Sequence, residues 1–389
     1  CALGLVPENQ IFLGLADSTV VLFGGMFVVG AAMFYTGLAQ KIGGGVVRMF
    51  GKGENSLMFG IMIIAALMSA VLSNTGTTAC LIPVVMGICA NAKISASREL
   101  MPLAFAAGLG GTITLIGTPP NILANVALKA AGMPELQFGF FEYAWIGIPI
   151  TIAGIVYMMF IGKYLLPKDS GTLNLEIDEE ILENETSTQK QIICGIIMVG
   201  VIGSMATGIV PLEIAAVVGA VIAVLTGCLT EKQAYNSIDW VTIFLFAGMI
   251  PVATAMNTSG AGKLIAEATV KMLGGDPSPY MVTAVLFGLA VVLTQFMSNT
   301  ASKALLCPVG IALSAQMGAS PKAVLMAILI ASSCAFASPV GTPPNTLVLG
   351  PGGYKFMDYL KAGTGLVAVC LIVSIIVIPI VWPFFPVSA

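Results

Sequence analysis

Long apolar stretches dominate the chain and alternate with short polar segments. Several stretches reach the ~20 residues that a helix needs to cross the hydrocarbon of a bilayer. The series of ten-residue alternating segments typical of a membrane β-barrel is absent from the sequence. One segment, residues 166–189, has a loop-like composition, with seven acidic side chains. The pattern predicts an all-α polytopic membrane protein divided near its middle by an acidic loop.

Composition supports this class and narrows the chemistry. The 389 residues are 57% hydrophobic and only 9% charged, whereas soluble domains carry about a quarter charged residues. A net charge of −3 offers no basic surface for nucleic acid. Without histidine, and without an Asp or Glu pair in the apolar stretches, an enzyme is not expected. The eight cysteines lack metal-ligand spacing and are interpreted as small packing residues.

Two motifs occur twice, in the same order. Ser73-Asn74-Thr75 recurs as Ser298-Asn299-Thr300, at an offset of 225 residues. The pentapeptide Gly-Thr-Pro-Pro-Asn at residues 117–121 recurs at residues 341–345, at an offset of 224. Nearly equal offsets indicate an internal structural repeat.

The distribution of Lys and Arg predicts that the two repeats are inverted. We place the acidic loop in the cytoplasm and read each Ser-Asn-Thr segment as the tip of a re-entrant hairpin. Eleven Lys and Arg then fall on the cytoplasmic side and four on the other, as the positive-inside rule expects. The hairpin at residues 57–90 would open to the cytoplasm, and that at 281–315 to the outside. The counterparts of the spans at 192–210 and 214–228 would lie before residue 1. We therefore expect that the chain lacks at least two N-terminal helices of the first repeat.

Both motifs predict helices that are broken inside the membrane. The arms beside each Ser-Asn-Thr are too short to cross a bilayer comfortably, and such a tip exposes carbonyls for a cation and N–H groups for a carboxylate. The paired prolines unwind the helices predicted over 103–131 and 324–350, freeing the carbonyls of Gly117 and Gly341. Packing serines and proline kinks without function are the alternative, but paired breaks in two repeats point to a transporter's midplane site.

The doubled motif resembles that of the divalent anion/sodium symporters, the di- and tricarboxylate transporters. The resemblance implies a homodimer in which a transport domain moves like an elevator against a fixed scaffold. The implied division is scaffold at 1–53 and 190–276, transport domain at 54–166 and 277–389, and a cytoplasmic loop at 167–189.

The resemblance also implies site residues. One sodium site is expected at Ser69, Ser73, Asn74 and Gly117, and a second at Thr294, Met297, Asn299 and Gly341. The residues expected to bind substrate are Asn74, Thr75, Ser298, Asn299, Thr300, Pro119 and Pro343. Lys303 departs from the family pattern, since its counterpart in the first repeat is Thr78. It either snorkels into a water-filled crevice or lies close to the second sodium site and modulates ion dependence.

The leading hypothesis is sodium-coupled uptake of a C4-dicarboxylate such as succinate, malate or fumarate across a bacterial inner membrane. Sodium-independent dicarboxylate exchange is the first alternative. An anion channel is the second, although both hairpins end at mid-depth and leave no continuous polar pore. Sulfate, citrate and 2-oxoglutarate are also compatible with the sequence.

Overall fold

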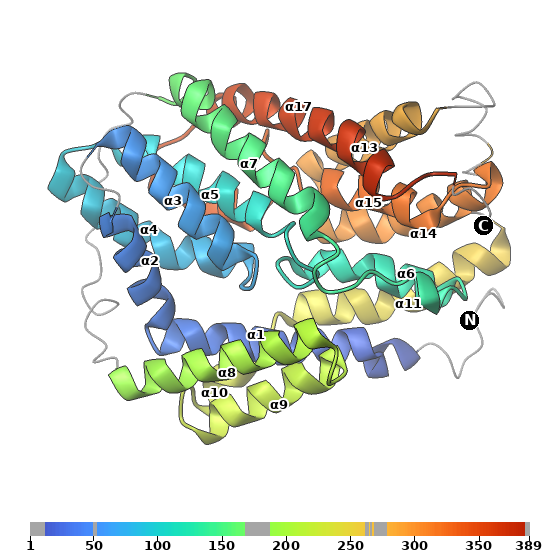
Figure 1. The fold of residues 1–389 in the computed structure, drawn as a ribbon, viewed down its shortest axis with the longest axis horizontal. Coiled ribbons are helices and arrows are strands. Elements are labelled where there is room, and N and C mark those ends of the chain that lie inside the picture. The colour runs from blue at the N-terminus through green and yellow to red at the C-terminus, as the bar shows by residue number, and fades with distance from the viewer. Residues whose placement is uncertain are drawn as a thin grey trace.

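The computed structural model describes residues 12–49, 53–167, 187–260, 264, 267 and 278–385. Every regular element among these residues is a helix, so the predicted all-α fold is confirmed (Figure 1). The central acidic segment, residues 168–186, lies outside the described residues. So do residues 261–263, 265, 266 and 268–277.

Four helices form a layer along one side of the molecule, at the lower edge in Figure 1. The long helix α1 packs against α8, α9 and α10 in this layer. Their bounds are α1 (Ser18–Tyr35), α8 (Thr188–Thr207), α9 (Leu212–Leu225) and α10 (Glu231–Ser237).

A second, larger group of helices comes from both halves of the chain. Here α3 packs on α5, α5 on α7, α7 on α17, and α17 on α13 and α15. The bounds of this group are α3 (Glu54–Ser69), α4 (Asn74–Ala92), α5 (Leu100–Gly110), α6 (Leu123–Ala130), α7 (Ala144–Phe160), α13 (Pro279–Phe296), α14 (Asn299–Met317), α15 (Pro321–Ala331), α16 (Pro343–Leu349) and α17 (Phe356–Val381). Short 3₁₀ helices connect these elements: η2 (Leu13–Ala16), η3 (Ala96–Arg98), η4 (Pro119–Ile122), η5 (Pro134–Leu136) and η6 (Gly162–Tyr164).

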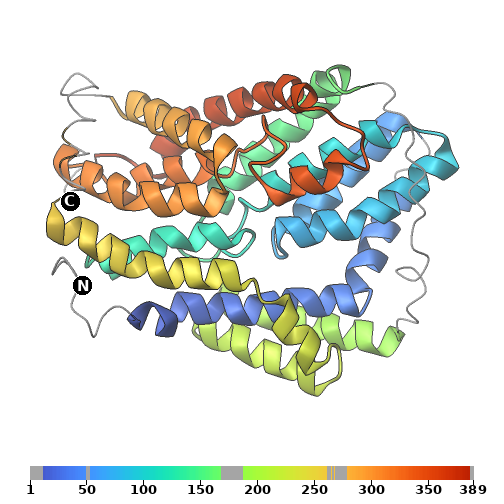
Figure 2. The ribbon, with the colours of Figure 1, turned by 180° about the vertical axis from the view of Figure 1, so that it is seen from behind.

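The two halves interlock within this group. Helix α4 of the first half packs on α16 of the second, and α14 of the second half packs on α6 of the first. Two more helices, α2 (Leu38–Met49) and α11 (Trp240–Ser259), contact the larger group: α2 packs against α3 and α4, and α11 against α6 and α14. Figure 2 shows α11 running between the layer and the larger group.

Four of the described helices, α4, α8, α13 and α17, are long and apolar enough to cross a membrane. A fifth span results if α1 and α2, which meet at 64°, count as one broken helix. Large apolar side chains such as Val199, Leu225 and Phe296 are at least 72% exposed. Burying such side chains in lipid rather than exposing them to water fits an integral membrane protein.

All four predicted helix breaks are present. The first tip separates α3 from α4 at residues 70–73, and the second separates α13 from α14 at 297–298. The helix predicted over 103–131 ends as α5 at Gly110 and resumes at Pro119, and that over 324–350 ends as α15 at Ala331 and resumes at Pro343. Proline lies at the first position of each resumed helix, where its missing N–H costs nothing. The seven described cysteines are buried free thiols, which confirms their interpretation as packing residues.

Candidate functional site

The two tips have the same local structure. Ser73 is extended, and its hydroxyl oxygen accepts a 3.1 Å hydrogen bond from the N–H of Gly76, so it caps α4. Ser298 caps α14 in the same way, accepting from the N–H of Ala301 at 3.2 Å. A serine N-cap satisfies one of the unpaired N–H groups of a helix start. The serines therefore fix where each arm begins and leave the first N–H groups of both helices at the tip.

Behind the first tip, oxygen atoms converge on the side chain of Asn74. One end of its amide lies 2.7 Å from the hydroxyl of Ser69, 3.1 Å from the carbonyl of Gly117 and 3.3 Å from the carbonyl of Ala107. With nitrogen at that end the amide donates to these three acceptors. Ser69, Asn74 and Gly117, which were predicted to share a sodium site, are thus together, and the carbonyl of Ala107 joins them.

Behind the second tip the arrangement is equivalent. The hydroxyl of Thr294 lies 2.8 Å both from Oδ1 of Asn299 and from the carbonyl of Ser332. Gly341 lies so close that a Cβ there would be 2.7 Å from the carbonyl of Thr294. Met297 is extended at the end of α13, which leaves its carbonyl outside the helix. Thr294, Asn299 and Gly341, three of the four residues predicted to share the second sodium site, thus lie together, and the carbonyl of Ser332 joins them.

Each unwound segment is held by an asparagine. The amide nitrogen of Asn121 donates to the carbonyls of Gly111 and Thr114, at 3.0 and 2.9 Å. That of Asn345 donates to Ala335 and Ser338, at 2.9 and 2.8 Å. These bonds satisfy carbonyls that the broken helices leave unpaired, which a buried chain requires. The asparagine that ends each Gly-Thr-Pro-Pro-Asn motif thus stabilises the unwound segment of its own half through two hydrogen bonds.

The two tips and the two unwound segments meet at one cavity of about 480 Å³, a volume within the range of small-molecule pockets. All seven residues predicted to bind substrate line it. From the motifs, the lining comprises Ser73, Asn74, Thr75, Gly76, Thr118, Pro119, Pro120, Ser298, Asn299, Thr300, Thr342 and Pro343.

The opposite wall contains residues that the sequence motifs did not indicate. It is formed by Phe27 of α1 and by Ser237, Asp239, Val241, Thr242 and Leu245 around the start of α11. Among the described lining residues, Asp239 alone has a charged side chain. Its carboxylate accepts from the N–H and hydroxyl of Thr242, at 3.2 and 2.5 Å. Asp17 directly precedes α1, just as Asp239 directly precedes α11. This equivalent position in the two halves was the only feature of the sequence that could have indicated Asp239.

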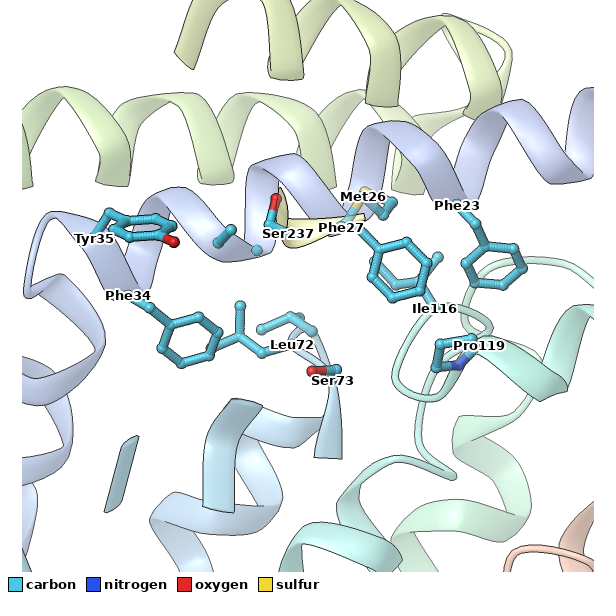
Figure 3. Close-up of a pocket in the computed structure, with 13 residues that line it drawn as sticks. Phe23, Met26, Phe27, Phe34, Tyr35, Leu72, Ser73, Ile116, Pro119 and Ser237 are labelled. Atoms are coloured by element: carbon cyan, nitrogen blue, oxygen red, sulfur yellow. The ribbon is translucent and has the colours of Figure 1, made fainter. Parts of the chain in front are cut away.

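An apolar cleft of about 300 Å³ adjoins this cavity between α1 and the first tip (Figure 3). Phe27 and Phe34 of α1 extend toward the side of the cleft formed by Leu72, Ile116 and Pro119. Phe27, Ser73, Pro119 and Ser237 line both spaces, which makes the two spaces neighbours. The layer and the larger group therefore face each other here through mainly apolar side chains.

Lys303 lies inside the larger group and is fully buried. Its ammonium donates to Oδ1 of Asn121 at 2.8 Å and to the hydroxyl of Ser333 at 2.7 Å. It therefore does not snorkel to a surface crevice in this structure, and it connects the first unwound segment with the second.

Comparison with known proteins places the chain in a family. The sequence profile of the citrate transporter family, CitMHS, matches residues 1–306, and the chain belongs to this family of carboxylate transporters. It is 32% identical to an uncharacterised transporter of Haemophilus influenzae over 96% of this chain and 83% of that protein. It is 26% identical to the sodium-dependent dicarboxylate transporter SdcS of Staphylococcus aureus, over 97% and 79% of the two chains.

Solved structures with the same fold are also transporters. YdaH of Alcanivorax borkumensis superposes with a TM-score of 0.68 at 18% identity, over 96% of this chain and 86% of that one. MtrF of Neisseria gonorrhoeae superposes with 0.67 at 14% identity, over 98% and 84%. At these identities the likeness concerns the fold. The chain is an integral membrane transporter of the citrate transporter family.

Proposed function

We propose that this protein is a secondary active transporter that moves C4-dicarboxylates such as succinate, malate and fumarate, coupled to sodium, across a bacterial inner membrane. The observation that carries the proposal is the single cavity at which both Ser-Asn-Thr tips and both Gly-Thr-Pro-Pro-Asn segments meet. The relative SdcS, named as a sodium-dependent dicarboxylate transporter, supports both the substrate class and the ion.

A dicarboxylate suits the two helix starts at this cavity. Thr75 and Gly76 of α4 and Thr300 of α14 line the cavity, so the first turns of both helices lie at its wall. Unpaired N–H groups and the positive end of the dipole favour an anionic group at such a position. A substrate with two carboxylates uses both helix starts, whereas a monocarboxylate uses only one.

Sodium suits the oxygen clusters behind the tips. At Asn74, the hydroxyl of Ser69 and the carbonyls of Gly117 and Ala107 surround one end of the amide. Turning that amide by 180° lets its oxygen accept from the Ser69 hydroxyl but points it at the carbonyls of Gly117 and Ala107, which a cation between the oxygens would make favourable. Unwound carbonyls and half-helix ends coordinate sodium in broken-helix transporters. The Thr294 cluster is its equivalent in the second half.

For transport, we propose that residues 54–166 and 277–389 move as one body against a scaffold formed by residues 1–53 and 190–276, within a homodimer. The apolar cleft beside α1 supports this division, because the apolar side chains Phe23 and Phe27 line it together with Ile116 and Pro119 and form no directional bonds that sliding would break. The equivalent serine caps of the two tips support an internal repeat, and an alternating-access cycle uses such a repeat in inverted form.

The test is uptake of labelled succinate into proteoliposomes. We expect an inward sodium gradient to drive accumulation above the external concentration, and unlabelled internal succinate to be unnecessary. Accumulation that requires internal dicarboxylate and ignores sodium would establish exchange instead. Uptake that never exceeds the external concentration would contradict sodium coupling and favour the channel. Competition by malate, fumarate, citrate and sulfate then ranks the substrates.

A further inference from the structure

Lys303 combines full burial with an unusual set of partners. It lies in α14, four residues after Asn299, and its ammonium donates to an amide oxygen of Asn121 and a hydroxyl of Ser333. Among the described residues, its ammonium forms no salt bridge with a carboxylate. Two neutral hydrogen bonds do not offset the cost of burying an ammonium, whereas an opposite charge nearby would.

The two hydrogen-bond partners of the ammonium each lie near one of the proposed sodium sites. Its partner Asn121 also donates to the carbonyl of Gly111, and a Cβ on Gly111 would meet the amide of Asn74 at 2.2 Å. Its other partner, Ser333, directly follows Ser332, whose carbonyl accepts from Thr294. Lys303 therefore contributes a positive charge between the two oxygen clusters.

The other half of the molecule lacks this charge. Thr78 occupies the equivalent position on α4, and its hydroxyl donates to the carbonyl of Asn74 at 2.9 Å. The Oδ1 of Asn345 is buried and has no hydrogen-bond partner in the described structure, although Asn121 and Asn345 otherwise make equivalent bonds. Asn345 stabilises the second unwound segment without an ammonium beside it. An asparagine therefore does not need a lysine partner to stabilise such a segment.

We propose that Lys303 is a fixed cation buried beside the transport site, outside the cavity lining, that offsets one of the two charges of a dicarboxylate. This proposal rests on the proposed function and specifies its ion coupling. With the lysine charge in place, a single sodium ion makes the loaded site neutral, and each cycle carries one net negative charge inward. Without the lysine charge, two sodium ions are required for the same neutrality. A doubly charged anion is accordingly the favoured substrate.

The charge carried per cycle tests this in the parent protein. We expect succinate uptake at fixed sodium to accelerate at an inside-positive voltage, and the reversal potential to give one sodium ion per succinate. Uptake accelerated by an inside-negative voltage, or two or more sodium ions per succinate, would overturn the proposal. This test needs no variant, so misfolding cannot obscure it.

Variants test the lysine itself. Lys303→Met retains the length of the side chain without its charge, and Lys303→Thr copies the first half. In both we expect the Hill coefficient for sodium to rise by about one and the voltage dependence to disappear. Lys303→Arg keeps the charge and should resemble the parent, and Lys361→Thr, an exposed lysine, is the matched control. Folded, transporting Met and Thr variants with the parent's sodium curve would overturn the proposal.

The two proposals fail in different ways. If the parent transports succinate only by exchange and without sodium, the sodium coupling of the proposed function is wrong. The role of Lys303 is then decided by succinate affinity, which a fixed cation raises. Lys303→Met would lose about tenfold or more in affinity while Lys303→Arg would not, and equal affinities in the two variants would refute the fixed cation.

Discussion

The ammonium of Lys129, near the end of α6, lies 2.8 Å from Oδ2 of Asp17, which precedes α1. These residues belong to the proposed transport domain and scaffold, respectively, so the ion pair crosses the surface that must slide. Lys129 is half-exposed, and an exposed pair of this kind contributes roughly 0.2–1 kcal/mol. The pair therefore biases the position of the transport domain without locking it.

Lys129→Gln removes this bias. We expect the resting equilibrium to shift away from the present arrangement by up to about fivefold, the equivalent of roughly 1 kcal/mol. Thiol-labelling rates of a cysteine introduced at the cleft, for example Leu72→Cys, report this shift. The charge exchange Asp17→Lys with Lys129→Asp should restore the parent rate. Identical rates in all forms would mean that the pair does not bridge moving parts.

The glycines of the two unwound segments give a second prediction. A Cβ at Gly117 would be 2.8 Å from the carbonyl of Gly111 and 3.0 Å from that of Ser69, and one at Gly341 would be 2.7 Å from that of Thr294. Backbone atoms cannot yield to such contacts cheaply. We expect Gly117→Ala and Gly341→Ala to reduce sodium-driven uptake at least tenfold.

Two helical glycines are matched controls for these substitutions. A Cβ at Gly87 of α4 or Gly288 of α13 would meet nothing within 4 Å. Gly87→Ala and Gly288→Ala should therefore transport like the parent, with monodispersity in detergent confirming that all four variants fold. Loss of uptake in the controls as well would show that the membrane helices tolerate no added methyl group. The close contacts of Gly117 and Gly341 with backbone carbonyls would then not be the cause of the loss.

The hydroxyls below the tips give a third prediction. Ser69 lies beside Asn74 and Thr294 beside Asn299, each in an oxygen cluster proposed to bind sodium. Ser69→Ala and Thr294→Ala each remove one ligand and leave the tip caps intact. We expect the sodium concentration for half-maximal uptake to rise several-fold, with the ranking of dicarboxylates unchanged. If neither variant altered the sodium titration, the oxygen clusters would be structural only.

Much of this site could be predicted because its motifs occur twice in the sequence. The spacing of Ser73-Asn74-Thr75 and Ser298-Asn299-Thr300 identified both tips, and the paired prolines identified both breaks. These features depend on local chemistry: serine capping of a helix start and proline unwinding of a helix. Both effects act within a few residues, and so both can be predicted from the sequence without knowing the tertiary structure.

The remaining features depend on long-range packing, which no local pattern records. The carbonyls of Ala107 and Ser332 joined the oxygen clusters because α5 and α15 end beside the tips, and a carbonyl has no sequence signature. Lys303 was recognised as unusual, but its bond to Asn121 spans 182 residues. Asp239 came to the cavity through the packing of α11. These contacts were fixed by how the halves interlock.

Asp239 gives the fourth prediction. A carboxylate at the wall of a cavity that receives a dianion weakens binding by like-charge repulsion. Asp239→Asn removes the charge and can still cap the start of α11, where Thr242 now donates. We expect the succinate concentration for half-maximal uptake to fall several-fold. Glu213→Gln, near the start of α9 and outside the cavity lining, is the charge-matched control. An unchanged half-maximal concentration in Asp239→Asn would mean that this charge does not act on the substrate, and a raised one that it acts favourably, for instance by attracting sodium.

The fifth prediction concerns Glu99, which lies between η3 and α5 outside the predicted spans. Both of its carboxyl oxygens are buried and have no hydrogen-bond partner in the described part of the chain. Burial and, to a smaller extent, the charge of Glu54 raise the pKa of this carboxyl, Arg98 opposes both, and together they place the pKa at about 8. The ordinary pKa of a glutamate is about 4.3, so the folded protein holds this proton more tightly than the unfolded chain.

Linkage gives the sign of the effect. A group whose pKa is raised by folding stabilises the protein fully below its unfolded pKa, and this contribution is lost as pH rises through about 8. The chain has no histidine, so no imidazole changes charge between about pH 6 and pH 9. We expect the melting temperature in detergent to fall by a few degrees over this range. Glu99→Gln, which imitates the protonated carboxyl, should abolish that fall and melt above the parent at pH 9. Glu135→Gln, at an exposed position of η5, should keep the parent's slope. Parallel pH profiles for the parent and Glu99→Gln would show that the carboxyl ionises at its ordinary pKa, with its oxygens hydrated.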